Sequence, residues 1–343
     1  MQLRFIRSAL LACAGLAYAV SADDIPSDTP SNAFSFAVVA DPRAEGPSWR
    51  NALREIRDLK KNPSPAFSPV QWIVVAGDID PAVLRYADYT NAFPSAQARP
   101  PLLAVVGNHD LGAADFPFIR DVMIPAVPGI IRRQPSSCDY YRDYRNVRMI
   151  VVDAYGDCGK AGVIRGTGLR WVEQVIGETP ENIDHIFISF HEPAFPRGRH
   201  VTDSFNANIK QRDAFWRMLL SAGGGRVRAV FVGHTHSYSR MRVRDPGSEA
   251  ANNLSAFPNE DGGIYQIDAG AAGHGLTNTL VQVQVEGKDL LFRALQSAAG
   301  PDQPFAVCDR WELPQTHTKL TANAQEVKVA PICVKADRAR TMR

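Results

Sequence analysis

Short apolar runs, each about as long as a β-strand, recur along the chain and end abruptly in small or polar residues. The first of them occupy residues 34–40, 71–76, 102–106, 148–152, 185–190 and 228–232. These runs are rich in Val, Ile and Phe and lack the alternation of a half-exposed strand, which indicates strands buried on both faces. Helix-like segments lie between them, at residues 48–61, 168–176 and 206–221. The alternation of strands and helices predicts a layered α/β fold.

The apolar rhythm continues in the last third of the chain and then stops. Three further strands are predicted at residues 263–269, 279–286 and 290–295, with a Glu-Gly-Lys-Asp hairpin turn between the last two. We therefore assign one domain to residues 34–299. Residues 300–343 lack the rhythm and are interpreted as a C-terminal extension packed on that domain. The polar, Pro-rich residues 23–33 are interpreted as a flexible lead-in.

The N-terminus has the layout of a secretory signal. Arg4 and Arg7 precede an apolar core at residues 8–20, and small residues surround the bond after Ala22. This layout predicts a signal peptide of residues 1–22 and export to the periplasm or the medium. The core is shorter than the ~18 apolar residues that span a bilayer, and no other run reaches that length, so we expect no membrane span.

Composition and charge disfavour several classes of protein. Apolar residues make up 45% of the chain, which is enough for a large core. The 38 basic and 36 acidic side chains leave a net charge of +2, whereas a nucleic-acid-binding protein would carry a clear basic excess. Neither a Walker-type phosphate loop nor a Gly-x-Ser-x-Gly sequence occurs, so nucleotide-driven motors and serine hydrolases are also disfavoured.

The cysteines predict disulfide bonds in the mature chain. Removal of the signal peptide takes away Cys13 and leaves four cysteines, and an even number in an exported chain is typical of disulfides. Pairing between sequence neighbours needs the least loop closure, which favours the pairs Cys138–Cys158 and Cys308–Cys333. Reduced, buried thiols are the alternative.

Chemically active side chains follow five of the buried strands. The positions after these strands hold Asp41, Asp78, the sequence Asn108-His109-Asp110, His191, and the pair His234 and His236. The carboxyl ends of parallel strands meet at one edge of an α/β sheet, so we expect these side chains to lie together. Carboxylate and imidazole ligands suit Zn, Mn or Fe and not Ca. The sequence therefore predicts a transition-metal site.

The Gly107-Asn-His-Asp110 and Gly233-His-Thr-His236 sequences are similar to motifs of the calcineurin-like metallophosphoesterases, a superfamily that includes the purple acid phosphatases. The resemblance extends over residues 34–295. It implies a four-layer α/β/β/α sandwich that holds two divalent or trivalent transition-metal ions between its sheets. It also implies phosphoester hydrolysis, because two ions about 4 Å apart hold the phosphate oxygens and lower the pKa of a shared water enough to form hydroxide near neutral pH.

The resemblance also implies a role for each residue. Asp78 would bridge both ions, because its carboxylate has two oxygens. His109, oriented by Asp110, would stabilise the transition state or protonate the leaving oxygen, which suits a side chain that titrates near neutrality. The remaining ligands would be Asn108, His191 and His234 at one site, and Asp41 and His236 at the other.

Two positions depart from the family pattern. Most members have a histidine two residues after the first aspartate, but this chain has Arg43, which is permanently charged and has no lone pair for a metal. Purple acid phosphatases supply a tyrosine three residues after the bridging aspartate, where this chain has Pro81. The Asp41 site therefore lacks one ligand and is expected to bind metal weakly, and either Asp80 or solvent fills the gap. Arg43 itself is either a structural ion pair or, as we favour, a clamp on substrate phosphate.

Several polar residues near these motifs have weaker functional signals. His185 begins a buried strand and is expected to be structural. His200 and His274 lie on loops that either face the site or are solvated. Tyr238 and Arg240 follow the last motif and either pair with other side chains or contact phosphate.

The expected function is that of an exported, metal-dependent phosphoesterase that hydrolyses phosphomonoesters. Phosphodiesterase or nucleotide hydrolase activity is the alternative among enzymes. The alternative from another class is a homologue that binds phosphate or a partner protein without turnover, and it rests on the missing ligand at Arg43. The sequence indicates neither the exact substrate nor the oligomeric state.

Overall fold

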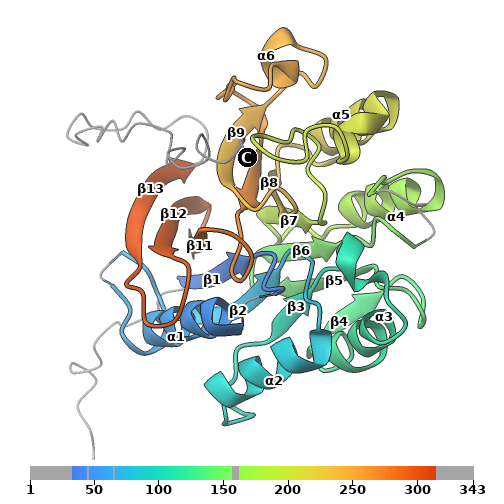
Figure 1. Cartoon of the computed structure of the whole chain (residues 1–343). Coiled ribbons are helices and arrows are strands. Elements are labelled where there is room, and N and C mark those ends of the chain that lie inside the picture. The colour runs from blue at the N-terminus through green and yellow to red at the C-terminus, as the bar shows by residue number, and fades with distance from the viewer. Residues whose placement is uncertain (1–32, 45, 65, 157–161, 314–343) are drawn as a thin grey trace, which may run out of the picture. The chain divides into compact units, whose positions relative to one another are not determined.

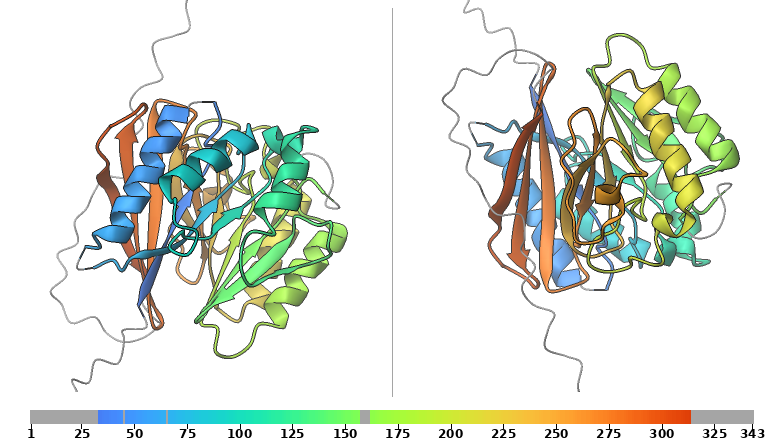
Figure 2. Two further views of the ribbon diagram at one scale, coloured as in Figure 1. Left: turned by 90° about the horizontal axis from the view of Figure 1, so that it is seen from below. Right: turned by 90° about the horizontal axis from the view of Figure 1, so that it is seen from above.

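Two mixed β-sheets face each other at the centre of the fold (Figures 1 and 2). The computed structural model describes residues 33–44, 46–64, 66–156 and 162–313. The first sheet has the strand order β13 (Ala306–Leu313), β12 (Asp289–Ala298), β11 (Thr277–Glu286), β1 (Phe34–Val39), β2 (Val70–Val75), β3 (Leu102–Ala104). The second has the order β4 (Ile130–Arg132), β5 (Tyr140–Tyr144), β6 (Val147–Val151), β7 (His185–Ser189), β8 (Val227–Val232), β10 (Ile264–Ala269), β9 (Tyr238–Val243).

Helices cover the outer faces of the two sheets. In Figure 1, α1 (Gly46–Lys61) and α2 (Ala82–Ala92) lie beside the first sheet, and α4 (Gly166–Gly177) and α5 (Ile209–Ala222) lie beyond the second. Shorter helices, α3 (Asp115–Phe118) and α6 (Glu249–Asn252), lie in the connections. These layers confirm the predicted α/β/β/α sandwich.

The central strands are buried on both faces, as the unbroken apolar runs predict. On β6, Val147, Met149 and Val151 belong to the core that contains the first sheet. Their neighbours Ile150 and Val152 belong to a second core, which includes residues of α4 and α5. Since successive side chains of a strand point to opposite faces, the second sheet is packed against the first sheet on one side and against helices on the other.

Parallel pairing brings the ends of the motif-bearing strands to common edges. In the first sheet β1 pairs with β2 and β2 with β3, all in parallel. In the second sheet β6, β7, β8 and β10 are also parallel neighbours. The loops that follow these strands therefore leave each sheet on the same side, where the candidate ligands lie.

Some elements were not anticipated from the sequence. The edge strand β9 has alternating burial and carries two arginines among its six residues, so it has no continuous apolar run. β13 is mostly exposed, and it shows that residues 306–313, assigned to an irregular extension, complete the first sheet as an edge strand. β13 pairs on one side only, and the outer side of β9 makes only an isolated bridge between Arg242 and Asn259, which explains the polar composition of both strands.

Several expectations concern residues that the structure does not describe. The signal peptide, residues 23–32 of the lead-in, and Cys158 and Cys333 lie outside the described ranges, so the export and disulfide assignments stay predictions. Cys138 and Cys308, which are described, form no disulfide with each other. Among the described residues, no helix has the length and apolar character needed to cross a membrane.

Candidate metal centre

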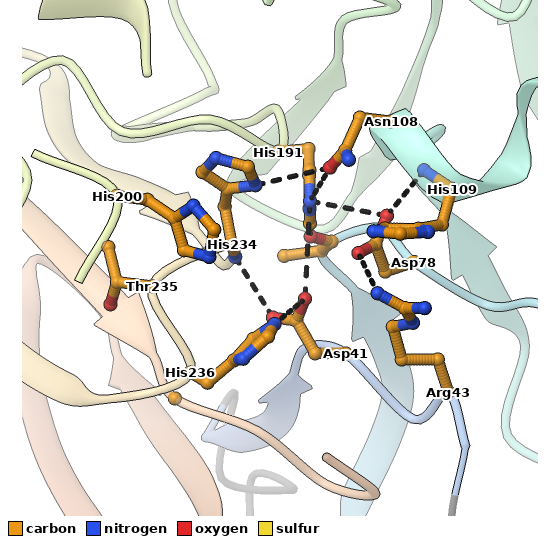
Figure 3. A network of polar contacts seen from close by, with 12 residues as sticks. Asp41, Arg43, Asp78, Asn108, His109, His191, His200, His234, Thr235 and His236 are labelled. Atoms are coloured by element: carbon orange, nitrogen blue, oxygen red, sulfur yellow. Dashed lines mark hydrogen bonds and ion pairs between the residues drawn. The ribbon is translucent and has the colours of Figure 1, made fainter. Parts of the chain in front are cut away.

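The six predicted metal ligands come together between the two sheets (Figure 3). They are delivered by the loops that follow β1, β2, β3, β7 and β8, which is the order predicted from the sequence. Two of the carboxylates, Asp41 and Asp78, are almost completely buried, with exposed fractions of 0% and 1%. Carboxylates are seldom buried without a charged partner, so this cluster has the burial expected of a metal site.

Three pairs of donor atoms in the cluster have the spacing of neighbouring ligands of one metal ion. Asn108 Oδ1 lies 3.1 Å from His191 Nε2 and 3.1 Å from His234 Nδ1. His191 Nε2 lies 3.3 Å from Asp78 Oδ1. Ligand bonds of about 2.0–2.1 Å at tetrahedral angles place neighbouring donor atoms roughly 3.3 Å apart. These three distances make Asp78, Asn108, His191 and His234 a candidate ligand set for one transition-metal ion.

The tautomer of His191 leaves its lone pair facing this group. Its Nδ1 lies 2.7 Å from the carbonyl oxygen of Ala76, which can only accept, so Nδ1 carries the proton. Nε2 then faces Asn108 Oδ1 and Asp78 Oδ1. The amide oxygen of Asn108 can only accept a hydrogen bond, and so can the carboxylate of Asp78 when it is ionised. Acceptors that face one another require a proton or a cation between them. A metal ion satisfies all of them at once.

The pKa values of the two buried histidines, His191 and His234, are shifted in opposite directions from the ordinary value of histidine. Burial alone would lower the pKa of His191, but the neighbouring Asp78 carboxylate outweighs it and raises this pKa to about 10. Burial, reinforced by the charge of His191, lowers the pKa of His234 to about 3. In the metal-free protein His191 thus holds a proton that an ion must displace, while His234 is already neutral and ready to coordinate.

Asp41 lies at the other end of the cluster. Its Oδ2 accepts the backbone N–H of His234 at 3.0 Å, and its Oδ1 lies 3.4 Å from His236 Nε2 and 4.0 Å from His191 Nε2. Oδ1 is buried and accepts no hydrogen bond from the residues that the structure describes. Asp41, Asp78 and His191 can also offer one ligand atom each within 4.8 Å of one another. Asp41 thus has an oxygen available for a cation.

The backbone of the ligand loops is strained. Asp41, Asp78, His234 and His236 have φ values of 49°, 55°, 71° and 57°, in the left-handed region that few residues other than glycine adopt. Such conformations each cost on the order of 1–3 kcal/mol and persist where the surrounding structure imposes them, often at functional sites. Four candidate ligands share this property.

The glycines of the two motifs are explained by close approach. A Cβ atom on Gly107 would lie 2.3 Å from Asp78 Oδ1, and one on Gly233 would lie 2.6 Å from Asp41 Oδ2. Both distances are far below any ordinary contact. Each motif therefore needs a residue without a side chain at the point where its loop crosses a candidate ligand.

Asp110 holds the loop that carries Asn108 and His109. Its two oxygens accept backbone N–H groups, from Ile79 at 2.7 Å and from Gly107 at 2.8 Å. The sequence suggested that Asp110 orients the ring of His109, but its described bonds fix the backbone instead. The backbone N–H of His109 donates to Asp78 Oδ1 at 3.0 Å, and its exposed side chain stands beside Asp78 in Figure 3. Its catalytic role stays a prediction.

Arg43 reaches Asp78 and Asp80. Its Nη1 lies 3.9 Å from Asp78 Oδ2, and its Nε lies 3.3 Å from Asp80 Oδ1. In Figure 3, Arg43 and His109 stand to the right of Asp78, and the other histidines at the site stand to the left. Asp80 thus faces Arg43, and whether Asp80 or solvent completes the Asp41 site stays a prediction.

Two further histidines approach the ligands. The ring of His200 lies 4.3 Å from that of His234, and its Nδ1 lies 2.9 Å from Asp203 Oδ2. The ring of His274 lies 4.3 Å from that of His236. Both were expected either to face the site or to be solvated, and the structure places both beside candidate ligands. The three-residue spacing of His200 and Asp203 was the sequence signal for their pairing.

Other candidates have structural roles. Tyr238 and Arg240 both bind Asp309 on β13, at 2.7 Å and 2.8 Å, and so attach the edge strand to the other sheet. His185 is fully buried, and its Nε2 lies 2.9 Å from the Gly287 carbonyl oxygen.

One supporting residue escaped the sequence analysis. Asp268, at the end of β10, accepts the hydroxyl of Thr235 at 2.7 Å and holds the loop between His234 and His236.

Comparison with known proteins agrees with this geometry. The sequence profile of the calcineurin-like phosphoesterases matches residues 34–238, and the chain belongs to this family. No curated protein matches the chain significantly in sequence.

The chain is also similar to solved structures of this fold. One is the structure described as GAP50, the anchor in the inner membrane complex of Plasmodium, with 12% identity, a TM-score of 0.52, and coverage of 84% of this chain and 90% of that one. The Vps29 double mutant of Entamoeba histolytica has 10% identity and a TM-score of 0.36, with coverage of 82% of this chain and 100% of that one. At 12% identity the similarity to GAP50 shows the fold alone. The family is typically dinuclear, and the site described above supplies a candidate ligand group.

Proposed function

We propose that the protein is an exported, metal-dependent hydrolase that acts on phosphomonoesters. The observation that carries the proposal is the convergence of Asp78, Asn108, His191 and His234, in which neighbouring donor atoms lie 3.1–3.3 Å apart. Membership of the phosphoesterase family supports the reaction class. Export rests on the predicted signal peptide alone.

The residues around the candidate ligands suit phosphoester hydrolysis. A transition-metal ion held by these ligands supplies Lewis acidity toward the phosphate oxygens and activates water. Arg43 provides a fixed positive charge beside Asp78, suited to pairing with a phosphate oxygen. His109 is exposed beside the same carboxylate, where it can give a proton to the leaving oxygen. Asp110 and Asp268 hold the loops that position these groups.

Binding without turnover is the second candidate function. It is favoured by Arg43, which stands where the family pattern has a metal-binding histidine. The similar fold of GAP50, which is described as an anchor, is compatible with such a role but does not transfer it to this chain.

A panel of phosphoesters distinguishes these functions. The purified chain beginning at Asp23, supplied with Zn²⁺, Mn²⁺ or Fe²⁺, is tested on 4-nitrophenyl phosphate, an alkyl phosphomonoester, bis(4-nitrophenyl) phosphate and a nucleoside diphosphate. The proposal predicts that monoesters are hydrolysed fastest, and that Asn108→Ala and His234→Ala abolish the activity while the exposed Asn62→Ala does not. Faster hydrolysis of the diester or the nucleotide would select the other enzymatic alternative. Metal binding without hydrolysis of any ester would contradict the proposal.

A further inference from the structure

We propose that the site binds one metal ion tightly and that the guanidinium of Arg43 takes the place of the family's second ion. The inference rests on the proposed metal-dependent function only in assuming that the Asn108 site binds an ion. Asp78, Asn108, His191 and His234 form a chain of donor atoms 3.1–3.3 Å apart, which is the candidate site for that ion. The side chains around Asp41, which the family pattern assigns to a second ion, do not fit that ion, for three reasons.

The first reason is the position of Arg43. A carboxylate can bridge two ions with one oxygen on each, and Asp78 Oδ1 already faces His191 and the backbone N–H of His109. Asp78 Oδ2, the oxygen left for a second ion, faces Arg43 Nη1 at 3.9 Å. The guanidinium thus approaches the oxygen that the second ion would bind.

The second reason is that the Asp41 site gains no replacement ligand. Asp80 is paired with Arg43 Nε at 3.3 Å, and Pro81 has no donor atom in its side chain. Two groups of metal-binding side chains are compact within the described part of the chain, Asp41 with Asp78 and His191, and His200 with Asp203 and His234. Neither contains His236. The contacts of His236 include one carboxylate, Asp41, whose Oδ1 lies 3.4 Å from His236 Nε2, so His236 adds a single imidazole to the Asp41 side of the cluster.

The third reason is charge balance. Asp41, Asp78 and Asp80 are the carboxylates that contact Arg43 or the imidazoles of His191 and His236. One divalent ion and one guanidinium neutralise these three carboxylates. A second divalent ion would leave a double positive charge in a buried site, which is costly without further anionic ligands.

The surrounding structure holds Arg43 in this position. The Arg43 side chain is only 19% exposed. The loop after β10 packs directly on its backbone, since a Cβ atom on Gly273 would lie 2.5 Å from the Pro42 carbonyl oxygen and 2.7 Å from that of Arg43. The Ala272 N–H also donates to the Ala40 carbonyl at 2.8 Å. A cation fixed by its own backbone cannot dissociate, so it stays at the site at any metal concentration.

Metal stoichiometry tests the inference without reference to turnover. Metal-free protein is loaded with Zn²⁺ or Mn²⁺, dialysed, and analysed by plasma mass spectrometry, and the Mn²⁺ form is examined by electron paramagnetic resonance. The inference predicts about one tightly bound ion per chain and the hyperfine pattern of an isolated Mn²⁺. Arg43→His should raise the count to about two and tighten the second site at least ~10²-fold, because even changes outside the ligand shell alter metal affinity 10–100-fold. It should also produce the signal of a coupled Mn²⁺ pair.

Two further variants separate the causes. Arg43→Gln removes the charge without adding an imidazole, so the second site should tighten less than in Arg43→His. Arg120→His places a new histidine beside a surface aspartate, Asp121, and should leave the count at one. Thermal melting of each variant verifies that it is folded. Two tightly bound ions in the native protein, or an Arg43→His variant that is folded and still binds one, would overturn the inference. No tightly bound ion at all would overturn the proposed function together with it.

Discussion

Gly107→Ala tests whether the geometry of the candidate site depends on the backbone contact between its two central loops. A Cβ atom at this position would lie 2.3 Å from both the backbone nitrogen and Oδ1 of Asp78. Since Cβ contacts below 3.0 Å essentially do not occur, the two loops must separate by at least ~0.7 Å. One of the two clashing atoms is the backbone nitrogen of Asp78, so a rotamer change of the Asp78 side chain cannot relieve the clash.

The expected cost follows from that displacement. Overpacking of this kind destabilises a protein by about 1–3 kcal/mol. A displacement approaching 1 Å at a reactive centre lowers the rate by up to ~10²-fold. We therefore expect Gly107→Ala to lower the free energy of unfolding by about 1–3 kcal/mol. Metal affinity should fall with it, because Asp78 and Asn108 lie on the two loops that separate.

The assay combines denaturant unfolding with metal titration of the metal-free protein. Gly177→Ala is the matched control, because a Cβ atom there meets nothing within 4 Å, and the residue lies in α4. This control should be neutral or slightly stabilising, as alanine is favoured over glycine in helices. Wild-type stability and metal affinity in Gly107→Ala would refute the close approach of the two loops.

Four further predictions follow from the site and the sequence. His109→Ala should slow hydrolysis of alkyl phosphates by about 10²–10⁴-fold and of nitrophenyl phosphate far less, since a good leaving group needs no proton donor; equal losses would rule out this role. Because Asp78 outweighs burial and raises the pKa of His191 to about 10, metal binding at pH 8 should release a proton, which calorimetry in buffers of different ionisation enthalpy detects. For the same reason the metal-free protein gains full stability from this pair below about pH 6.5, the ordinary pKa of histidine, and loses it as the pH rises through 10; an Asn at position 191 should remove this slope. Non-reducing peptide mapping should find the pairs Cys138–Cys158 and Cys308–Cys333, and a cross-pair or free thiols would contradict that assignment.

The buried strands were predictable because each one is marked by an apolar run within its own few residues. The runs that became β1, β2 and β6 are apolar on both faces, so their sequence alone indicates central strands. The edge strands β9 and β13 were missed because their polar residues bind across the molecule. Arg240 and Asp309, for example, form an ion pair between two sheets, which no local pattern indicates.

The candidate site was predictable to the same degree. Asp41, Asp78 and His191 follow buried strands directly, so the topology of parallel strands brings them together. The pairing of Arg43 with Asp80 and the approach of His200 to His234 depend on loop conformations with positive φ, which composition does not determine. The bonds of Asp110 to two backbone amides were likewise visible only in three dimensions.

The central claim is that Asp78, Asn108, His191 and His234 bind a transition-metal ion. Anomalous diffraction at the Zn or Mn absorption edge, from crystals of the metal-loaded protein, tests it most directly. We predict a strong anomalous peak about 2.0–2.3 Å from His191 Nε2, His234 Nδ1, Asn108 Oδ1 and Asp78 Oδ1. A peak at His200 and Asp203 alone, or no peak between the two sheets, would contradict it.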